Sequence, residues 1–155
     1  MPWSYRTDGQ HSETHLKRMK EYGDDSMKMY EGIKTTKDNL IGNDTRFKGV
    51  IPAGTAILNA RSSFIGNGIH RDKISHLNKG VGRYIAAMAT CCTLTGVTPD
   101  QINYVPTDLL KDTPAGLNKD APGLQEALVK VARESVTNML AKPYEVTQSQ
   151  YKTAP

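Results

Sequence analysis

The sequence has no apolar segment long enough to cross a membrane. A transmembrane helix needs about 20 consecutive, predominantly apolar residues, and the chain has no such run. The first ten residues, MPWSYRTDGQ, lack the apolar core of a signal peptide. We therefore predict no membrane partner and no export signal in this chain.

A concentrated positive charge is also missing. The 20 lysines and arginines exceed the 16 acidic residues only slightly, and the net charge is +4. Basic residues are scattered among acids, without the aromatic side chains that line a nucleic-acid surface. We predict no nucleic-acid partner.

Cysteine is scarce, with only the adjacent pair Cys91 and Cys92. Neighbouring residues on a helix point in different directions and would not normally form a disulfide. Two thiols alone also cannot make a structural zinc site, so both are interpreted as small core residues. The spacing of His11 and His15 would suit a metal ion, but no third ligand can be named. Surface histidines are favoured, and neither a metal nor another cofactor is predicted.

The 155 residues suffice for one domain with a hydrophobic core. Strands are predicted at Met1–Tyr5 and Phe47–Pro52. Helices are predicted at 12–36, with an interruption at 23–25, and at 56–62, 80–96 and 122–141. The strand at 47–52 and the helix after it read as a βα unit of an α/β fold. The helix at 80–96 is apolar on every side, which predicts a buried helix. Residues 147–155 are polar and predicted to be a loose tail.

A loop rich in acid and imidazole leads into the helix at 80–96. It contains Asp72 and His76. In a Ser–His–Asp hydrolase, the histidine takes the proton of the serine and the aspartate holds the imidazole ring in the correct tautomer. On its own, the residue pair is more typical of two solvated surface groups, since Asp and His are common in loops.

Motifs on both sides of this pair occur in the same order in a bacterial family. They are IPAGTA (51–56), NARSSF (59–64), RD (71–72), HL (76–77), GVGRYIAA (80–87) and LTG (94–96). From about Trp3 to about Val146, the chain resembles the C-terminal half of a domain of unknown function placed among the SGNH/GDSL-type hydrolases. The resemblance implies catalytic His76 with Asp72 as its partner. It also implies an α/β fold, namely part of a doubly wound, flavodoxin-like parallel sheet with flanking helices, whose N-terminal strands are missing. Residues 1–146 would form that portion of the domain.

The spacing of the pair departs from the family pattern. The family has Asp-x-x-His, whereas three residues separate Asp72 from His76. Asn67 and His70 have the usual spacing, but an amide partner favours the wrong imidazole tautomer. The sequence after His76 follows the family without a gap, so Asp72 and His76 are preferred. A one-residue bulge could absorb the insertion or leave the carboxylate misaimed.

The nucleophile expected of such a hydrolase is missing from this sequence. No serine follows a strand in a Gly-Asp-Ser setting, and Gly42-Asn43-Asp44 reads as a turn. We therefore expect the chain to be inactive alone. In its parent, it would contribute Asp72 and His76 to hydrolysis of a small-molecule or carbohydrate ester. The sequence leaves the compartment of the parent open, and an exported parent, periplasmic or extracellular, is compatible with it. The alternative is a non-catalytic glycan-binding or structural module with a degenerate Asp–His loop.

Overall fold

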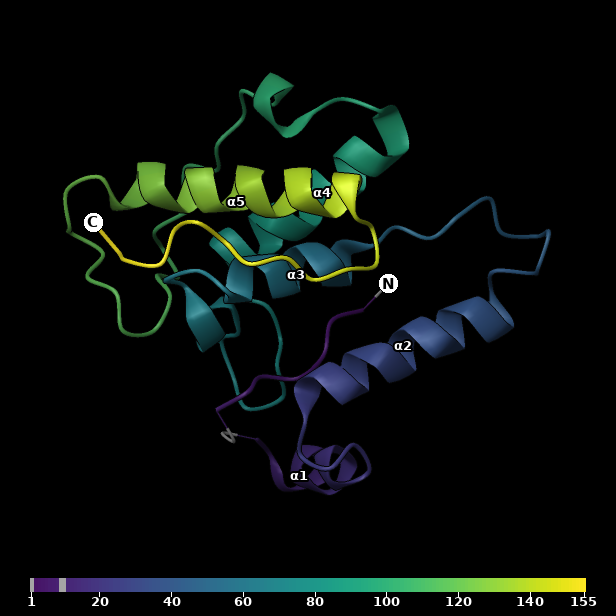
Figure 1. Cartoon of the computed structure of the whole chain (residues 1–155). Helices are drawn as coiled ribbons and strands as arrows, with labels where there is room; N and C mark the ends of the chain where they lie inside the picture. Colours follow the sequence, from purple (N-terminus) through teal and green to yellow (C-terminus); the bar gives the residue numbers. More distant parts are fainter. Residues whose placement is uncertain (1, 9–10) are drawn as a thin grey trace.

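The computed structural model describes residues 2–8 and 11–155 of the chain. It is built from helices joined by long loops (Figure 1). These helices are α1 (Glu13–Lys20), α2 (Ser26–Leu40), α3 (Ala53–Arg61), the 3-10 turn η1 (Gly66–Ile69), α4 (Val81–Thr95), the 3-10 turn η2 (Pro99–Gln101) and α5 (Leu124–Ala141).

The predicted α/β fold is wrong. Within residues 2–8 and 11–155 there is no β-sheet, and the one β-bridge joins His70 to Leu77 in antiparallel fashion. Residues 2–5 and 47–52, predicted as strands, form no strand in the described structure. Strand preference depends on neighbouring strands that cover and pair with a segment, and this chain offers neither segment such a partner. The doubly wound sheet therefore does not form.

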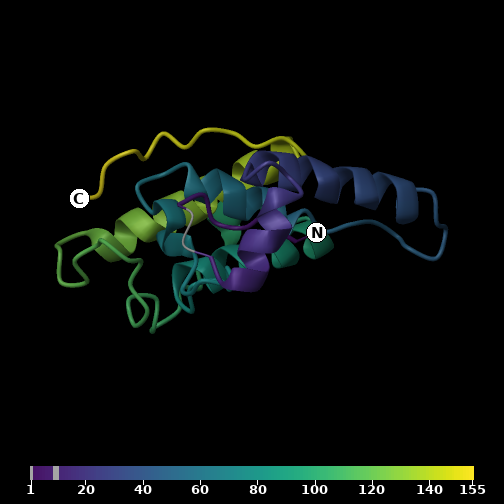
Figure 2. The same cartoon turned by 90° about the horizontal axis from the view of Figure 1, so that it is seen from below.

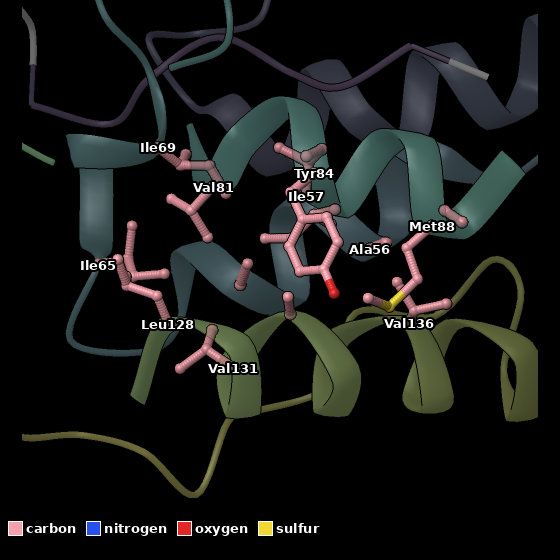
Figure 3. Close-up of a cluster of buried hydrophobic side chains, with 14 of the residues drawn as sticks. Ala56, Ile57, Ile65, Ile69, Val81, Tyr84, Met88, Leu128, Val131 and Val136 are labelled. Carbon is pink, nitrogen blue, oxygen red and sulfur yellow. The ribbon is translucent and has the colours of Figure 1, made fainter. Parts of the chain in front are cut away.

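Three helices form the hydrophobic core. α3 packs against both α4 and α5, and α4 packs against α5 (Figure 3). Ile57 of α3, Ile85 of α4 and Val131 of α5 are each completely buried where the helices meet. Burying a side chain of this size stabilises the fold by about 1.5–3 kcal/mol. The core is thus closed by helices alone, without a sheet.

The sequence predicted the end of α4 correctly and its burial only in part. Gly96 ends the helix in the left-handed conformation, with φ of 76°. Val81, Ile85 and Met88 face the core, but Leu94 is 71% exposed. The prediction that α4 is buried on every side is therefore wrong, because one face is exposed from Arg83 to Leu94. Of the two cysteines predicted in the core, Cys92 is buried and Cys91 is exposed.

α1 and α2 lie beside the three-helix core. The predicted interruption is confirmed, because Gly23 and Asp24 both have positive φ and the Asp25 side chain caps α2. Tyr30 attaches α2 to the core, and its side chain is fully buried. The loop after α2 projects away from the helices in both views (Figures 1 and 2). It contains the turn predicted at Gly42–Asp44 and an exposed Phe47.

The C-terminal residues run back along the core. Figures 1 and 2 show the segment after α5 passing beside α5 and α3. Buried Asn59 accepts a hydrogen bond from the backbone N–H of Thr147 at 2.8 Å, and Ser62 accepts one from Ser149 at 2.7 Å. The segment predicted to be loose, 147–155, therefore has specific contacts. Among the described residues, no helix is long and apolar enough to span a membrane.

Candidate functional site

Asp72 and His76 are in direct contact. The carboxylate oxygen Oδ2 of Asp72 lies 2.8 Å from the ring nitrogen Nδ1 of His76. The other oxygen, Oδ1, accepts the backbone N–H groups of Ile74 at 3.2 Å and His76 at 3.0 Å. An ionised carboxylate can only accept, so Nδ1 carries the proton and Nε2 is left as a free acceptor.

The loop absorbs its extra residue at Ser75. This residue has φ of 61°, in the left-handed region that side chains other than glycine seldom adopt. Its N–H donates to the carbonyl of Asp72, which closes a turn, and the N–H of Arg71 donates to the carbonyl of His76. The turn brings the carboxylate and the imidazole together despite the three intervening residues.

The N-terminal segment is hydrogen-bonded to this loop at several points. The indole N–H of Trp3 donates to the carbonyl of Ser75 at 2.9 Å, and the backbone N–H of Arg6 donates to the Ser75 hydroxyl at 3.2 Å. Arg6 also donates from Nη1 to the carbonyl of Asp72 at 3.3 Å, and the N–H of Ser12 donates to the carbonyl of Lys73 at 3.0 Å. Sequence reasoning missed the roles of Trp3 and Arg6, because no spacing rule links residues so far apart.

The pair is open to solvent on one side. The side chain of His76 is 55% exposed and that of Asp72 34%. Partial burial alone would raise the pKa of Asp72, but hydrogen bonds from the His76 ring and from the His76 and Ile74 N–H groups outweigh burial and lower it. Arg71 lies 3.6 Å from the same carboxylate. Asp72 is therefore held as an anion, the state that orients a histidine.

Comparison with known proteins identifies the family. A family model described as a domain of unknown function, DUF4886, matches residues 1–121. The chain belongs to the DUF4886 family. It is similar to a DUF4886 family protein from Bacteroides uniformis ATCC 8492, known from a crystal structure, with 29% sequence identity and a TM-score of 0.66. The alignment covers 98% of this chain and 50% of that chain, so this chain spans half the length of its relative.

The comparisons name no activity for the family. No protein of curated function matches the sequence significantly. The family description and the name of the relative state neither a substrate nor a reaction. Neither comparison links this DUF4886 chain to the SGNH/GDSL hydrolases.

Asn67 and His70, the alternative pair in this DUF4886 chain, have other partners. The Asn67 amide exchanges hydrogen bonds with the backbone and hydroxyl of Thr7. His70 is only 3% exposed, and its Nδ1 lies 3.2 Å from the carbonyl of Ser75. Burial, followed by the positive charge of Arg61, lowers the pKa of His70 to about 4. His70 is thus a neutral, buried support of the loop.

His11 and His15 pack as aromatic rings. His15 stacks on Tyr5 with ring centroids 4.0 Å apart, and His11 lies 6.0 Å from the same ring. Burial lowers the pKa of both histidines, and the charges of Asp72 and His76 also act on His15. No group of three or more potential metal ligands occurs in the described part of the chain.

Serine hydroxyls near the loop are already engaged. The Ser75 hydroxyl accepts from Arg6, and Ser4 and Ser26 accept from the guanidinium of Arg61 at 3.4 and 3.2 Å. No serine among residues 2–8 and 11–155 makes a hydrogen bond to the His76 ring. Within the described structure, the site is an acid–base pair without a nucleophile.

Proposed function

We propose that this chain provides the aspartate and histidine of an SGNH/GDSL-type ester hydrolase, whose serine nucleophile lies outside the described residues. The observation that carries the proposal is the 2.8 Å contact between Asp72 Oδ2 and His76 Nδ1. Two backbone N–H groups fix the same carboxylate. The loop backbone therefore holds the carboxylate toward the imidazole in addition to the ion pair, which at an exposed site contributes only about 0–1 kcal/mol.

The geometry assigns a role to each atom of the pair. Asp72 holds the proton on Nδ1, which leaves Nε2 of His76 free to accept a proton. A serine hydroxyl placed at Nε2 would transfer its proton there as it attacks an ester carbonyl, and His76⁺ would return that proton to the leaving alcohol. Asp72 stabilises the imidazolium formed between the two steps. The chain spans half of its relative's length, which leaves room for the serine elsewhere in the parent protein.

The tautomer can be tested on this chain directly. Nitrogen-15 NMR should show His76 protonated at Nδ1 and unprotonated at Nε2 when the ring is neutral, because Asp72 accepts from Nδ1. In the Asp72→Asn variant this preference should be lost, since an amide can also donate to Nδ1. A wild-type ring protonated at Nε2 would contradict the assignment.

A test of the catalytic role requires the natural gene product that contains this chain. Hydrolysis of p-nitrophenyl acetate should fall by at least ~10³-fold in His76→Ala, the order seen when a member of a catalytic triad is removed. Lys73→Ala, an exposed change on the same loop, should leave the rate unchanged. Unchanged turnover in His76→Ala would reject the proposal.

A glycan-binding module is the second candidate. A groove of about 610 Å³ between α5 and the C-terminal segment is lined by polar side chains, including Glu134, Asn138, Gln148 and Tyr151. Amides, carboxylates and an aromatic ring are suited to sugar hydroxyls and sugar faces. Calorimetry with soluble oligosaccharides should show binding, and Asn138→Ala should weaken it. The control variant His76→Ala should bind as tightly as the wild type.

A further inference from the structure

A second cleft lies between α4 and the chain that follows η2. This chain forms the upper edge of the molecule in Figure 1. The cleft encloses about 460 Å³, and its walls are mostly apolar, with Ala87, Met88 and Cys91 on α4 facing Ile102 and Pro106. Its size is that of ordinary ligand pockets, about 300–1,000 Å³.

The cleft carries a net positive charge at one end. Lys79, Arg83 and Asp108 line it there, and they also line a neighbouring cavity of about 470 Å³. That cavity adds Arg71, Lys111 and Asp112. Four cations thus face two carboxylates. Asp112 accepts the backbone N–H of Lys79 at 2.6 Å, which occupies one of its oxygens.

Three of these cations make no close ion pair in the described part of the chain. Among the residues that the structure describes, Lys79, Arg83 and Lys111 make no ion pair within 4.0 Å, whereas Arg71 lies 3.6 Å from Asp72. Positive groups gathered around a cavity attract an anion, and the attraction is strengthened where the walls exclude water. The apolar cleft and the positive cavity share residues, so one ligand could occupy both.

We propose that this continuous site binds an anionic single-chain amphiphile, namely a medium-chain aliphatic carboxylate. Its chain would lie along Ala87, Met88 and Ile102, where burial stabilises binding by about 25 cal/mol per Å² of apolar surface. Its carboxylate would meet Arg83 and Lys79. The charge at the end of the cleft selects this ligand, because a neutral alcohol gains nothing there and an alkylammonium is repelled.

The surroundings of the cleft agree with an apolar ligand. Tyr104, which lines the cleft, is 69% exposed, and Leu94, about one turn after Cys91 on α4, is 71% exposed. The Tyr84 hydroxyl already donates to the carbonyl of Tyr104 at 2.8 Å, so it leaves no unpaired polar group in the wall. The inference does not rest on the hydrolase proposal, since it requires neither a nucleophile nor His76.

Cys91 provides a reporter for the test. It is exposed and lines the cleft, whereas Cys92 is buried. Octanoate below its micellar concentration should slow alkylation of Cys91 by iodoacetamide at least ~5-fold at saturation. Octanol should protect at least ~10-fold more weakly, which corresponds to about 1.4 kcal/mol for the lost charge interaction. Octylammonium should not protect.

Variants separate the charged end from the apolar cleft. In Lys79→Ala/Arg83→Ala, half-protection should require at least ~10-fold more octanoate, while Lys119→Ala, a cation outside the cavity, should match the wild type. Both replaced side chains are exposed, so the fold should survive, and circular dichroism would verify that. Equal protection by octanol, no protection by octanoate, or an unaltered double variant would each overturn the inference. Because the readout is thiol protection, these results are independent of any hydrolase activity.

Discussion

The indole N–H of Trp3 donates a hydrogen bond to the carbonyl oxygen of Ser75 at 2.9 Å, across 72 residues of sequence. The same carbonyl also lies 3.2 Å from Nδ1 of His70. One peptide group of the Asp72–His76 loop is therefore held from two sides. The precision of a catalytic pair depends on such supports, because small displacements of acid–base groups reduce rates strongly.

Removing the Trp3 support should loosen the loop. Trp3→Phe keeps most of the apolar surface and loses the N–H donor, so the free energy of unfolding should fall by about 1 kcal/mol. Hydrogen exchange of the His76 amide should become faster than in the wild type. Tyr104→Phe, a change at an exposed ring, serves as the control and should alter neither quantity.

The backbone of Ser75 gives a second prediction. Its φ of 61° is easy for glycine and costly for a β-branched residue. Ser75→Val should destabilise the protein by about 1–3 kcal/mol relative to Ser75→Gly. Both variants lose the hydroxyl that accepts from Arg6, so the loss of that hydrogen bond cancels in the difference between them. Equal melting temperatures would contradict the left-handed assignment.

The third prediction concerns His70, whose lowered pKa should make the stability of the protein depend on pH. The pKa of His70 is lowered from 6.5 to about 4, so below pH 6.5 the unfolded chain binds a proton that the folded chain refuses. Stability should therefore fall as pH drops from 6.5 to 4, by at most about 3 kcal/mol, and level off below the folded pKa. Asp72 contributes outside this range. Its pKa lies below 3.8, so its contribution persists above that value and is lost only in stronger acid.

The comparison for this pH effect is His70→Asn. Urea unfolding between pH 4 and 7 should show a clearly smaller slope in the variant, and the amide can still donate to Ser75. His11 and His15 also have lowered pKa values and add slope of the same sign, so the variant should not be flat. An unchanged slope would mean that His70 is not buried in its neutral form.

Local rules in the sequence predicted much of the helical structure. The interruption at 23–25, the end of α4 at Gly96 and the helix at 122–141 all follow from residues close together in the sequence, and all are present. The contact between Asp72 and His76 also lies within one loop. The prediction of a sheet was wrong for the opposite reason. Phe47–Pro52 has the composition of a strand, but a strand also needs partners, and the local pattern cannot supply them. Trp3 and Arg6 were missed because only the folded chain brings them to Ser75.

A relay of hydroxyl groups joins α2, α3 and the C-terminal segment. Oγ1 of Thr55 donates to the carbonyl of Pro143 at 2.6 Å, so the Tyr30 hydroxyl, 2.5 Å away, must be the donor to Thr55. Tyr30→Phe should destabilise the fold by about 1 kcal/mol. Thr55→Val should cost more, because it leaves both Tyr30 and Pro143 without a partner. A double-mutant cycle would measure the coupling, and strict additivity would contradict the relay.

The last prediction concerns Gly80, at the start of α4. A Cβ atom added to Gly80 would collide with the carbonyl oxygen of Leu109, a backbone atom that cannot move aside like a flexible side chain. Gly80→Ala should therefore displace the 106–112 segment and destabilise the fold by about 1–3 kcal/mol, as overpacking of a close contact does. Gly49→Ala is the matched control, since nothing lies within 4 Å of its Cβ position. Because Asp108 and Lys111 line the positive cavity, the same variant should weaken octanoate protection of Cys91. Wild-type stability in Gly80→Ala would show that Leu109 does not approach α4 as described.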